Sequence, residues 1–359
     1  MKFLLYTGQI TFGGAERVLC VLANSLVAKG HNVRFFFGDK HVLPYQIEPA
    51  VEVSFHHNPI RYNNPISLIK EISAIHTQVK TYKPDVVITF FSQWAVFAHF
   101  AILFNKRVKL IYSQRNDPLQ DKGRNKIMDT LATKWADCVV FQSKAVKELY
   151  GKGIQRRSVI ITNPFNPEKL PEYDIGRTQD IIISAGRLAN QKNHRLLIES
   201  FALLRRDLPG LKLKIFGEGH LRETLQKQIE SLGLHDDVLL PGNSSSLWEE
   251  MSNSRLFVLS SDYEGVPNIL IEAMCMGMPC ISTDFSPKGA VGELLVNGEN
   301  GLVVETGNPK IMAMAMKKLL MDVEESKRLG NNARKLIHKV DSAVVMDQWE
   351  HLCSNLINR

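Results

Sequence analysis

The segment LFVLSSDYEGVPNILIEA, residues 256–273, gives the clearest indication of the fold class. Its first four residues form a short apolar run of the kind that builds a buried strand, and helical spacing of apolar residues extends over 268–276. Pro267 suits the first position of this helix, Asn268 offers cap chemistry, and Gly277 ends the element. The segment therefore predicts a strand, a loop and a helix, the repeating unit of a parallel α/β sheet.

Two carboxylates frame the start of this helix. Glu264 lies on the loop at the carboxyl end of the strand, and Glu272 lies about one turn inside the helix. Backbone amides at a helix start carry partial positive charge and suit an anionic diphosphate. The candidates for that contact are Val266, Pro267, Asn268 and Ile269.

A second polar segment follows another predicted strand, residues 181–184. It contains Gly186 and Arg187, with Lys192 five residues further on. Arginine offers a planar fork to phosphate oxygens and lysine offers a point charge, while Gly186 leaves room for close backbone approach. Arg187 and Lys192 could therefore hold two phosphates.

A third strand-to-helix turn contains Phe216, Gly217 and Gly219. Its glycines allow an aromatic base to lie against the backbone. The motif is short, but all three segments follow strands, and ligands of parallel sheets bind at the carboxyl ends of strands.

The strand and helix pattern recurs along the whole chain. The expected strands are 2–6, 31–37, 86–90, 109–112, 138–141 and 158–161 in the first half, and 181–184, 213–216, 238–240, 256–259 and 279–282 in the second. Between the halves, a proline-rich and polar stretch from Asn163 to Asp180 has the character of a linker. We expect two Rossmann-like, doubly wound parallel-sheet domains, residues 1–165 and 176–339, facing each other across a cleft.

The composition is that of a globular protein of 359 residues, with five scattered cysteines and no Cys-x-x-Cys pair. The apolar start is too short for a signal peptide, and the longest other apolar stretch, 94–104, is about half the roughly 20 residues that a membrane span needs. Its aromatic residues Trp94, Phe97, Phe100 and Phe104 favour a core helix over a lipid-facing patch. We expect a cytoplasmic protein.

The charge is unevenly distributed. Residues 1–165 hold 22 Lys and Arg against 11 Asp and Glu, whereas the remainder holds 22 against 26. Clusters at 106–109 and 122–126 would attract an anionic membrane leaflet, a lipid diphosphate or nucleic acid, unless they are only solvated faces. Binding of nucleic acid is not expected, because the basic half lacks interleaved surface aromatics or a known module.

Together these motifs resemble glycosyltransferase family 4. The shared features are Glu264-x7-Glu272, Gly186-Arg187 with Lys192, the turn at Gly217, and Gly13-Gly14 near the start, in the family's order over nearly the whole chain. The resemblance implies the GT-B fold, a nucleotide-sugar donor in the second domain and retention of the anomeric configuration. It also implies that the terminal helix, 340–359, packs back on the first domain.

The resemblance also implies residue roles. Arg187 and Lys192 would grip the diphosphate, Glu264 would contact hydroxyls of the transferred sugar, and these three residues are the catalytic candidates. Glu272 would contact the ribose. The base would lie at Phe216-Gly217, and the loop at Gly13 and Gly14 would close over donor phosphate or acceptor. Fixed cations and helix-end amides can neutralise the departing nucleoside diphosphate, so no metal ion or other cofactor is expected.

One segment departs from the family pattern. Many members carry a histidine after the strand that matches 109–112, where this chain has SQRNDP at 113–118. Arg115 takes the place of that histidine and could contact a phosphate or the acceptor. Asp117 is a possible substitute base, although a turn residue before Pro118 is an equally good interpretation.

The expected function is that of a retaining glycosyltransferase of the hexosyltransferase type. It would move a sugar from a nucleotide-diphosphate donor, by family a UDP-sugar, to a lipid-linked or cell-surface oligosaccharide in polysaccharide biosynthesis. A basic first domain suits an enzyme that is peripheral at the inner face of the cell membrane. Two alternatives stay open: a UDP-sugar 2-epimerase of the same fold, and a catalytically silent subunit that binds nucleotide sugars.

Overall fold

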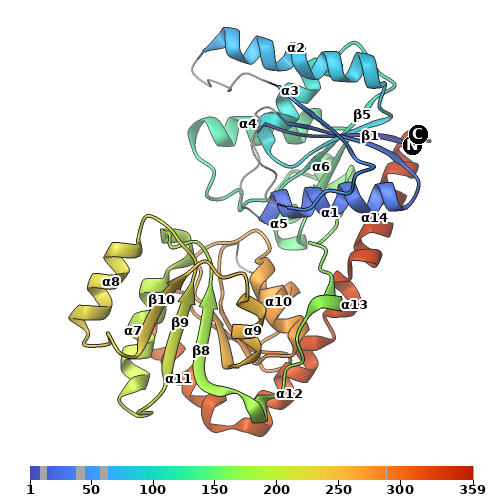
Figure 1. Ribbon diagram of the computed structural model, residues 1–359. Coiled ribbons are helices and arrows are strands. Elements are labelled where there is room, and N and C mark those ends of the chain that lie inside the picture. Colours follow the sequence, from blue (N-terminus) through green and yellow to red (C-terminus); the bar gives the residue numbers. More distant parts are fainter. Residues whose placement is uncertain (9–13, 38–44, 57–63, 288, 359) are drawn as a thin grey trace. The chain divides into compact units, whose positions relative to one another are not determined.

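The computed structural model describes residues 1–8, 14–37, 45–56, 64–287 and 289–358 (Figure 1). The chain divides into two compact units. Unit 1 consists of Met1–Pro164 and Ser342–Arg359, and unit 2 consists of Phe165–Asp341. Each unit is described below by itself.

The described residues of unit 1 form a 7-stranded, all-parallel sheet in the order β3-β2-β1-β4-β5-β6-β7. Its strands are β1 (Lys2–Thr7), β2 (Asn32–Phe37), β3 (Glu52–Phe55), β4 (Val86–Thr89), β5 (Lys109–Ser113), β6 (Cys138–Phe141) and β7 (Ser158–Ile160). The strand order reverses between β1 and β4, which makes this a doubly wound sheet.

Helices cover both faces of this sheet (Figure 1). They are α1 (Gly14–Ala28), α2 (Pro65–Tyr82), α3 (Ser92–Ile102), α4 (Gly123–Trp135), α5 (Lys144–Glu148), α6 (Lys152–Arg156) and α14 (Ser342–Ile357). Because side chains alternate along a strand, Phe3 and Leu5 of β1 pack with α1 and α14, whereas Leu4 and Tyr6 pack with α2 and α3. The strand is apolar throughout because both of its faces are buried.

The helix α14 lies far from the rest of unit 1 in the sequence but contributes to its core. Trp349 is fully buried and stacks on Phe90 with 6.0 Å between ring centroids. On the surface, Lys29 forms ion pairs with Asp347 and Glu350.

The aromatic residues of α3 and its end separate into two groups. Trp94 and Phe97 are buried, as expected, but Phe100 is 45% exposed and Phe104 is 95% exposed. The expectation that all four lie in the core was therefore wrong for the last two. The helix ends at Ile102, so Phe104 lies beyond the helical spacing that buries Trp94 and Phe97.

The described residues of unit 2 form a 6-stranded parallel sheet in the order β10-β9-β8-β11-β12-β13. Its strands are β8 (Gln179–Ala185), β9 (Lys212–Phe216), β10 (Val238–Gly242), β11 (Ser254–Leu259), β12 (Cys280–Thr283) and β13 (Leu302–Val304). Its helices are α7 (His194–Arg205), α8 (Arg222–Ser231), α9 (Leu247–Ser252), α10 (Asn268–Met276), α11 (Pro309–Met321), α12 (Val323–Arg334) and α13 (Ile337–Val340). Here the strand order reverses between β8 and β11, where such sheets bind ligands.

The predicted fold class, two doubly wound parallel-sheet α/β domains, is confirmed. The helix α10 spans the expected residues 268–276, but Pro267 is not its first residue. Pro267 has extended backbone angles, φ −76° and ψ 104°, so it is the N-cap and Asn268 is the first helical residue. Within the described part of the chain, the helices all fall short of the length and apolar character needed to cross a membrane.

Candidate active site

Three loops meet at one edge of the sheet of unit 2. They follow β8, β9 and β11, and these strands are neighbours in the order β9-β8-β11. Because parallel strands end at the same edge, the loops bring together residues that are distant in the sequence. Glu264, Lys192, Gly186 and Gly217 all lie on these loops.

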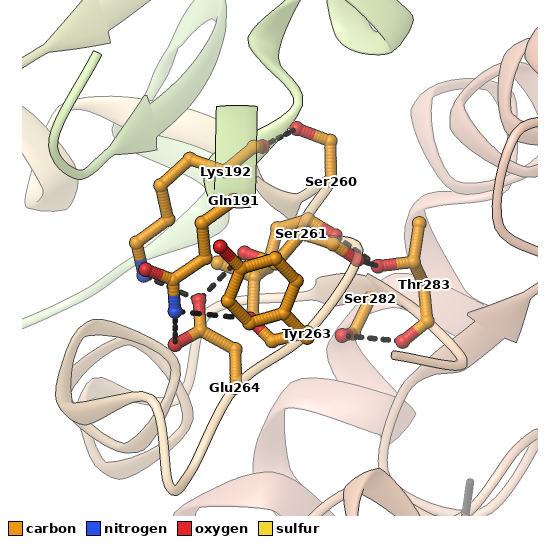
Figure 2. Close-up of polar contacts among 9 residues, drawn as sticks. Gln191, Lys192, Ser260, Ser261, Tyr263, Glu264, Ser282 and Thr283 are labelled. Atoms are coloured by element: carbon orange, nitrogen blue, oxygen red, sulfur yellow. Dashed lines mark hydrogen bonds and ion pairs between the residues drawn. The ribbon is translucent and has the colours of Figure 1, made fainter. Parts of the chain in front are cut away.

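Lys192 and Glu264 form an ion pair at the centre of this edge (Figure 2). Their side chains are only 15% and 7% exposed. The hydroxyl of Ser261 donates to Oε1 of Glu264 at 2.6 Å, and Nε2 of Gln191 lies 3.3 Å from Oε2. The carboxylate is thus held by three donors, as a buried charge requires.

The same two loops are joined by further hydrogen bonds. The amide of Asp262 donates to the carbonyl of Gln191 at 2.9 Å, and the hydroxyl of Ser260 donates to the carbonyl of Lys192 at 2.8 Å. The side-chain amide of Asn193 donates to Asp262 at 2.7 Å. The loops therefore hold Lys192 and Glu264 in one fixed relation.

Gly217 permits a close approach between two of the loops. Its φ is +129°, and a Cβ atom there would lie 2.1 Å from the carbonyl oxygen of Gly186. A Cβ on Gly186 would lie 3.0 Å from Cε of Lys192. The side chain of Phe216 is buried, so this turn presents backbone rather than an aromatic ring.

Glu272 lies inside α10 and is 6% exposed. The indole nitrogen of Trp248 in α9 donates to its Oε2 at 2.8 Å. Trp248 had no role in the sequence prediction, because the contact joins two helices that are separate in the chain. Val266 and the N-cap Pro267 lead from the loop that contains Glu264 into α10, whose first residues are Asn268 and Ile269.

Arg187 differs from Lys192 in being exposed, and its side chain makes no hydrogen bond or ion pair with the residues that the structure describes. It is therefore available to an incoming anion. His194, by contrast, is 3% exposed. Burial, with help from the Lys192 charge and opposed by the backbone of Gly186, lowers the pKa of His194 to about 4.

The remaining candidates belong to unit 1. Gly14 is the first residue of α1, and Gly13 lies outside the described residues. Asp117 is buried and accepts hydrogen bonds from the amide of Leu119 at 2.9 Å and from Gln120 at 3.4 Å. These are contacts of a turn-forming aspartate, so its carboxylate is engaged by its own loop.

Arg115 is buried, with 8% of its surface exposed. Its Nη1 donates to Oδ1 of Asn163 at 2.6 Å, and its guanidinium lies 3.8 Å from the ring centroid of Phe90. Burial lowers the pKa of Arg115 to about 9. No carboxylate among the described residues pairs with it.

Two doubly wound units, the second with cationic and carboxylate side chains gathered at its switch point, define a glycosyltransferase of the GT-B class. Residues 165–336 match the family model of glycosyl transferases group 1, and residues 12–169 match that of Glycosyltransferase Family 4. The chain belongs to the GT-B glycosyltransferases of the family 4 type, as the motifs predict.

Individual proteins agree with this assignment. An N-acetylgalactosamine-N,N'-diacetylbacillosaminyl-diphospho-undecaprenol 4-alpha-N-acetylgalactosaminyltransferase of Campylobacter jejuni is 29% identical over 350 residues, covering 93% of this chain and 94% of that protein. An uncharacterized glycosyltransferase of Methanocaldococcus jannaschii is 31% identical over 252 residues, but the match spans only 62% of that protein and 63% of this chain. The fold of Anabaena HepE, solved in complex with UDP, superposes with a TM-score of 0.79 at 19% identity, covering 99% of this chain and 100% of HepE.

Proposed function

We propose that this chain is a retaining glycosyltransferase that moves a sugar from a UDP-sugar to a lipid-linked or cell-surface oligosaccharide. The observation that carries the proposal is the Lys192–Glu264 ion pair, held beside the exposed Arg187 at the ligand-binding edge of unit 2. The relatives support it: the Campylobacter jejuni protein is named for a diphospho-undecaprenol substrate, and HepE was solved with UDP.

In this proposal the donor occupies unit 2. Arg187 and Lys192 bind the diphosphate together with the N-terminus of α10, where helix-end amides favour an anion. Glu264 accepts hydrogen bonds from hydroxyls of the transferred sugar, and Glu272 accepts them from the ribose. The nucleobase lies against the backbone at Phe216 and Gly217. Only glycine at position 217 allows this backbone to lie so close to Gly186.

Charge stabilisation is the main catalytic effect that we propose. The bond between the anomeric carbon and the β-phosphate oxygen breaks, and negative charge develops on the departing UDP. Fixed cations and amides stabilise that charge without reorganising during the reaction. The acceptor oxygen attacks the face that UDP leaves, and a phosphate oxygen of the donor takes its proton. The reaction as proposed uses no metal ion.

We also propose that unit 1 contacts an anionic membrane surface at the inner face of the cell membrane. Phe100, Leu103 and Phe104, at and just beyond the end of α3, are 45%, 45% and 95% exposed, and Lys106 and Arg107 follow after Asn105. We call these five residues the α3 tip. Exposed Phe and Leu side chains can insert at the boundary between headgroups and acyl chains, and adjacent cations are attracted to anionic lipids.

The test of the donor assignment is thermal stabilisation of the purified chain by nucleotide diphosphates and their sugars, because a ligand bound only by the native state raises the melting temperature. We expect a selective shift with UDP and with one UDP-sugar, lost in Arg187→Ala. Transfer is then measured with that sugar and a membrane lipid extract, and NMR of the first product establishes the anomeric configuration.

The alternatives give different results in the same experiment. Conversion of the UDP-sugar without any acceptor would favour the epimerase. A UDP shift with neither conversion nor transfer would favour a silent binding subunit. If no nucleotide raises the melting temperature, the assignment of the donor site to unit 2 is wrong.

A further inference from the structure

A small polar pocket lies in unit 1 at the carboxyl ends of β4 and β5. Its volume is about 150 Å³, below the roughly 300–1,000 Å³ of sites for larger ligands, so it suits a group such as one sugar ring or one phosphate. Arg115, Asp121 and four amide side chains line it: Gln93, Gln114, Asn116 and Asn125. Amides, with both donors and acceptors, suit sugar hydroxyls.

Arg115 is an unusual residue to line such a pocket, because its guanidinium forms no ion pair with any residue that the structure describes. Of its three side-chain nitrogens, Nη1 binds Asn163, whereas Nε and Nη2 are buried without a hydrogen-bond partner among the described residues. The aromatic ring of Phe90 offers a cation–π contact. Among the residues that the structure describes, no carboxylate forms an ion pair with Arg115. Buried charges in proteins are normally paired, so this guanidinium lacks a counter-ion that a ligand can supply.

Asp121 provides the opposite chemistry on the same pocket. Its carboxyl group makes no hydrogen bond or ion pair with the described residues. Burial, with repulsion from Asp129 and Asp117, raises the pKa of Asp121 to about 6. A carboxyl group in this state can donate or accept a hydrogen bond, which fits a hydroxyl group of the ligand.

We propose that this pocket binds an oxyanion carried by the acceptor, with the anion on Arg115 and the neighbouring hydroxyls on Asp121 and the amides. The phosphate of a lipid-linked sugar and the carboxylate of an acidic sugar share this chemistry. The inference rests on the proposed function, since it makes unit 1 the acceptor side. It adds a second anion site, because the proposed diphosphate contacts all belong to unit 2.

The first test is the stability of the unliganded chain. Arg115→Met keeps most of the side-chain length and removes the unpaired charge, so we expect an unchanged or higher melting temperature. A clear fall, with ligand responses intact, would mean that Arg115 is structural and would overturn the proposal. Arg115→Lys keeps a charge and should retain part of the ligand response. The matched control is Arg156→Met, at an exposed arginine of α6.

The second test uses pyrophosphate, glucuronate and neutral glucose as probes in thermal-shift measurements of the full chain. It is done in an Arg187→Ala background, which removes the proposed donor-phosphate contact. A shift with pyrophosphate alone assigns a phosphate-bearing acceptor, one with glucuronate alone assigns an acidic sugar, and shifts with both support the shared chemistry. Each of these thermal shifts must disappear in the double variant Arg187→Ala/Arg115→Met. Absence of shifts, or shifts that survive Arg115→Met, would overturn the proposal.

Kinetics separate this proposal from the donor assignment. With transfer established, Arg115→Met should raise the KM for the acceptor about tenfold or more and leave the KM for the UDP-sugar unchanged. The reverse pattern would place the anion of Arg115 on the donor and would refute an acceptor site. If UDP does not shift the melting temperature of the wild-type protein, the proposed function is wrong, whatever pyrophosphate, glucuronate and glucose show.

Discussion

Lys192 and Glu264 form an ion pair although 72 positions separate them in the chain, and both side chains are largely shielded from water. One belongs to the loop after β8 and the other to the loop after β11. The pair therefore links the two strands between which the sheet of unit 2 reverses its order, and the proposed diphosphate and sugar contacts depend on each other.

Breaking this pair should damage both activity and stability. Lys192→Met leaves Glu264 buried without its counter-ion, at a cost on the order of 3 kcal/mol in the free energy of unfolding. Lys192→Met/Glu264→Gln removes both charges and should recover most of that loss while transfer stays abolished. Denaturant unfolding and a transfer assay measure the two effects. Recovery of transfer in the double variant would contradict the proposed roles.

The close approach of Gly217 to Gly186 predicts that Gly217→Ala will weaken UDP binding. The added Cβ would overlap the carbonyl of Gly186, which must shift together with the neighbouring Arg187. We expect at least a tenfold loss of UDP affinity by titration calorimetry. Gly210→Ala is the control, because Gly210 also has positive φ, +92°, but open space around its Cβ position. Equal effects of the two substitutions on UDP affinity would exclude the steric argument.

Glu272 should give the site its preference for ribose. Hydrogen bonds to a charged group contribute about 1.5–3 kcal/mol, so Glu272→Gln should lose roughly tenfold or more in UDP affinity. The loss should be much smaller for a deoxyribose analogue of UDP. Trp248→Phe removes the hydrogen-bond donor to Oε2 of Glu272. It should also reduce the preference for UDP over its deoxyribose analogue, by a smaller factor than Glu272→Gln. If UDP and both 2'- and 3'-deoxy analogues lose affinity equally in Glu272→Gln, Glu272 does not contact the ribose.

Buried His194 predicts a pH dependence of stability. Its pKa is lowered from 6.5 to about 4, so the unfolded chain takes up a proton at a pH where the folded chain does not. Neutral, buried His194 makes its full contribution to the free energy of unfolding above pH 6.5, and this contribution is lost as the pH falls towards 4. At about 1.4 kcal/mol per pKa unit this amounts to on the order of 3 kcal/mol.

The measurement compares unfolding free energies of wild type and His194→Gln between pH 7 and pH 4. The unfolding free energy of wild type should fall relative to that of His194→Gln as the pH is lowered from 7 to 4. His220→Gln, at an exposed histidine of the same unit, is the control. A constant difference across the window would contradict a depressed pKa at His194.

The α3 tip predicts how the chain associates with lipid. Phe104→Ser should reduce binding to vesicles that contain phosphatidylglycerol several-fold, and Lys106→Glu/Arg107→Glu should reduce it further and remove its salt dependence. Vesicle sedimentation gives the bound fraction. The control, Lys227→Glu/Lys310→Glu, makes the same charge change at exposed lysines of unit 2. An equal loss of vesicle binding in that control would show that binding depends on net charge and not on the α3 tip.

The central strands and α10 were predictable because their patterns are local. Buried parallel strands are continuous apolar runs, and the bounds of α10 follow from its apolar spacing and from Gly277. The edge strands β3 and β13 were missed. They have four and three residues, and β3 is only half-buried, so neither gives a clear apolar run.

Other features depend on contacts that no local pattern contains. The burial of His194, the bond from Trp248 to Glu272 and the exposure of Phe104 are set by elements that pack from elsewhere in the chain. The unpaired state of Arg115 is of the same kind: its place after a strand is readable from the sequence, but whether a described carboxylate pairs with it depends on the folded unit. Sequence motifs thus located candidate residues, and packing determined their surroundings.

The return of α14 to unit 1 bears on how the protein is made. Unit 2 is continuous in the chain, whereas unit 1 needs residues that are synthesised only after all of unit 2. When the first 164 residues have emerged from the ribosome, Phe90 still lacks its stacking partner Trp349. Until translation reaches α14, this apolar face stays open to solvent and to chaperones, so unit 2 can complete its fold before unit 1.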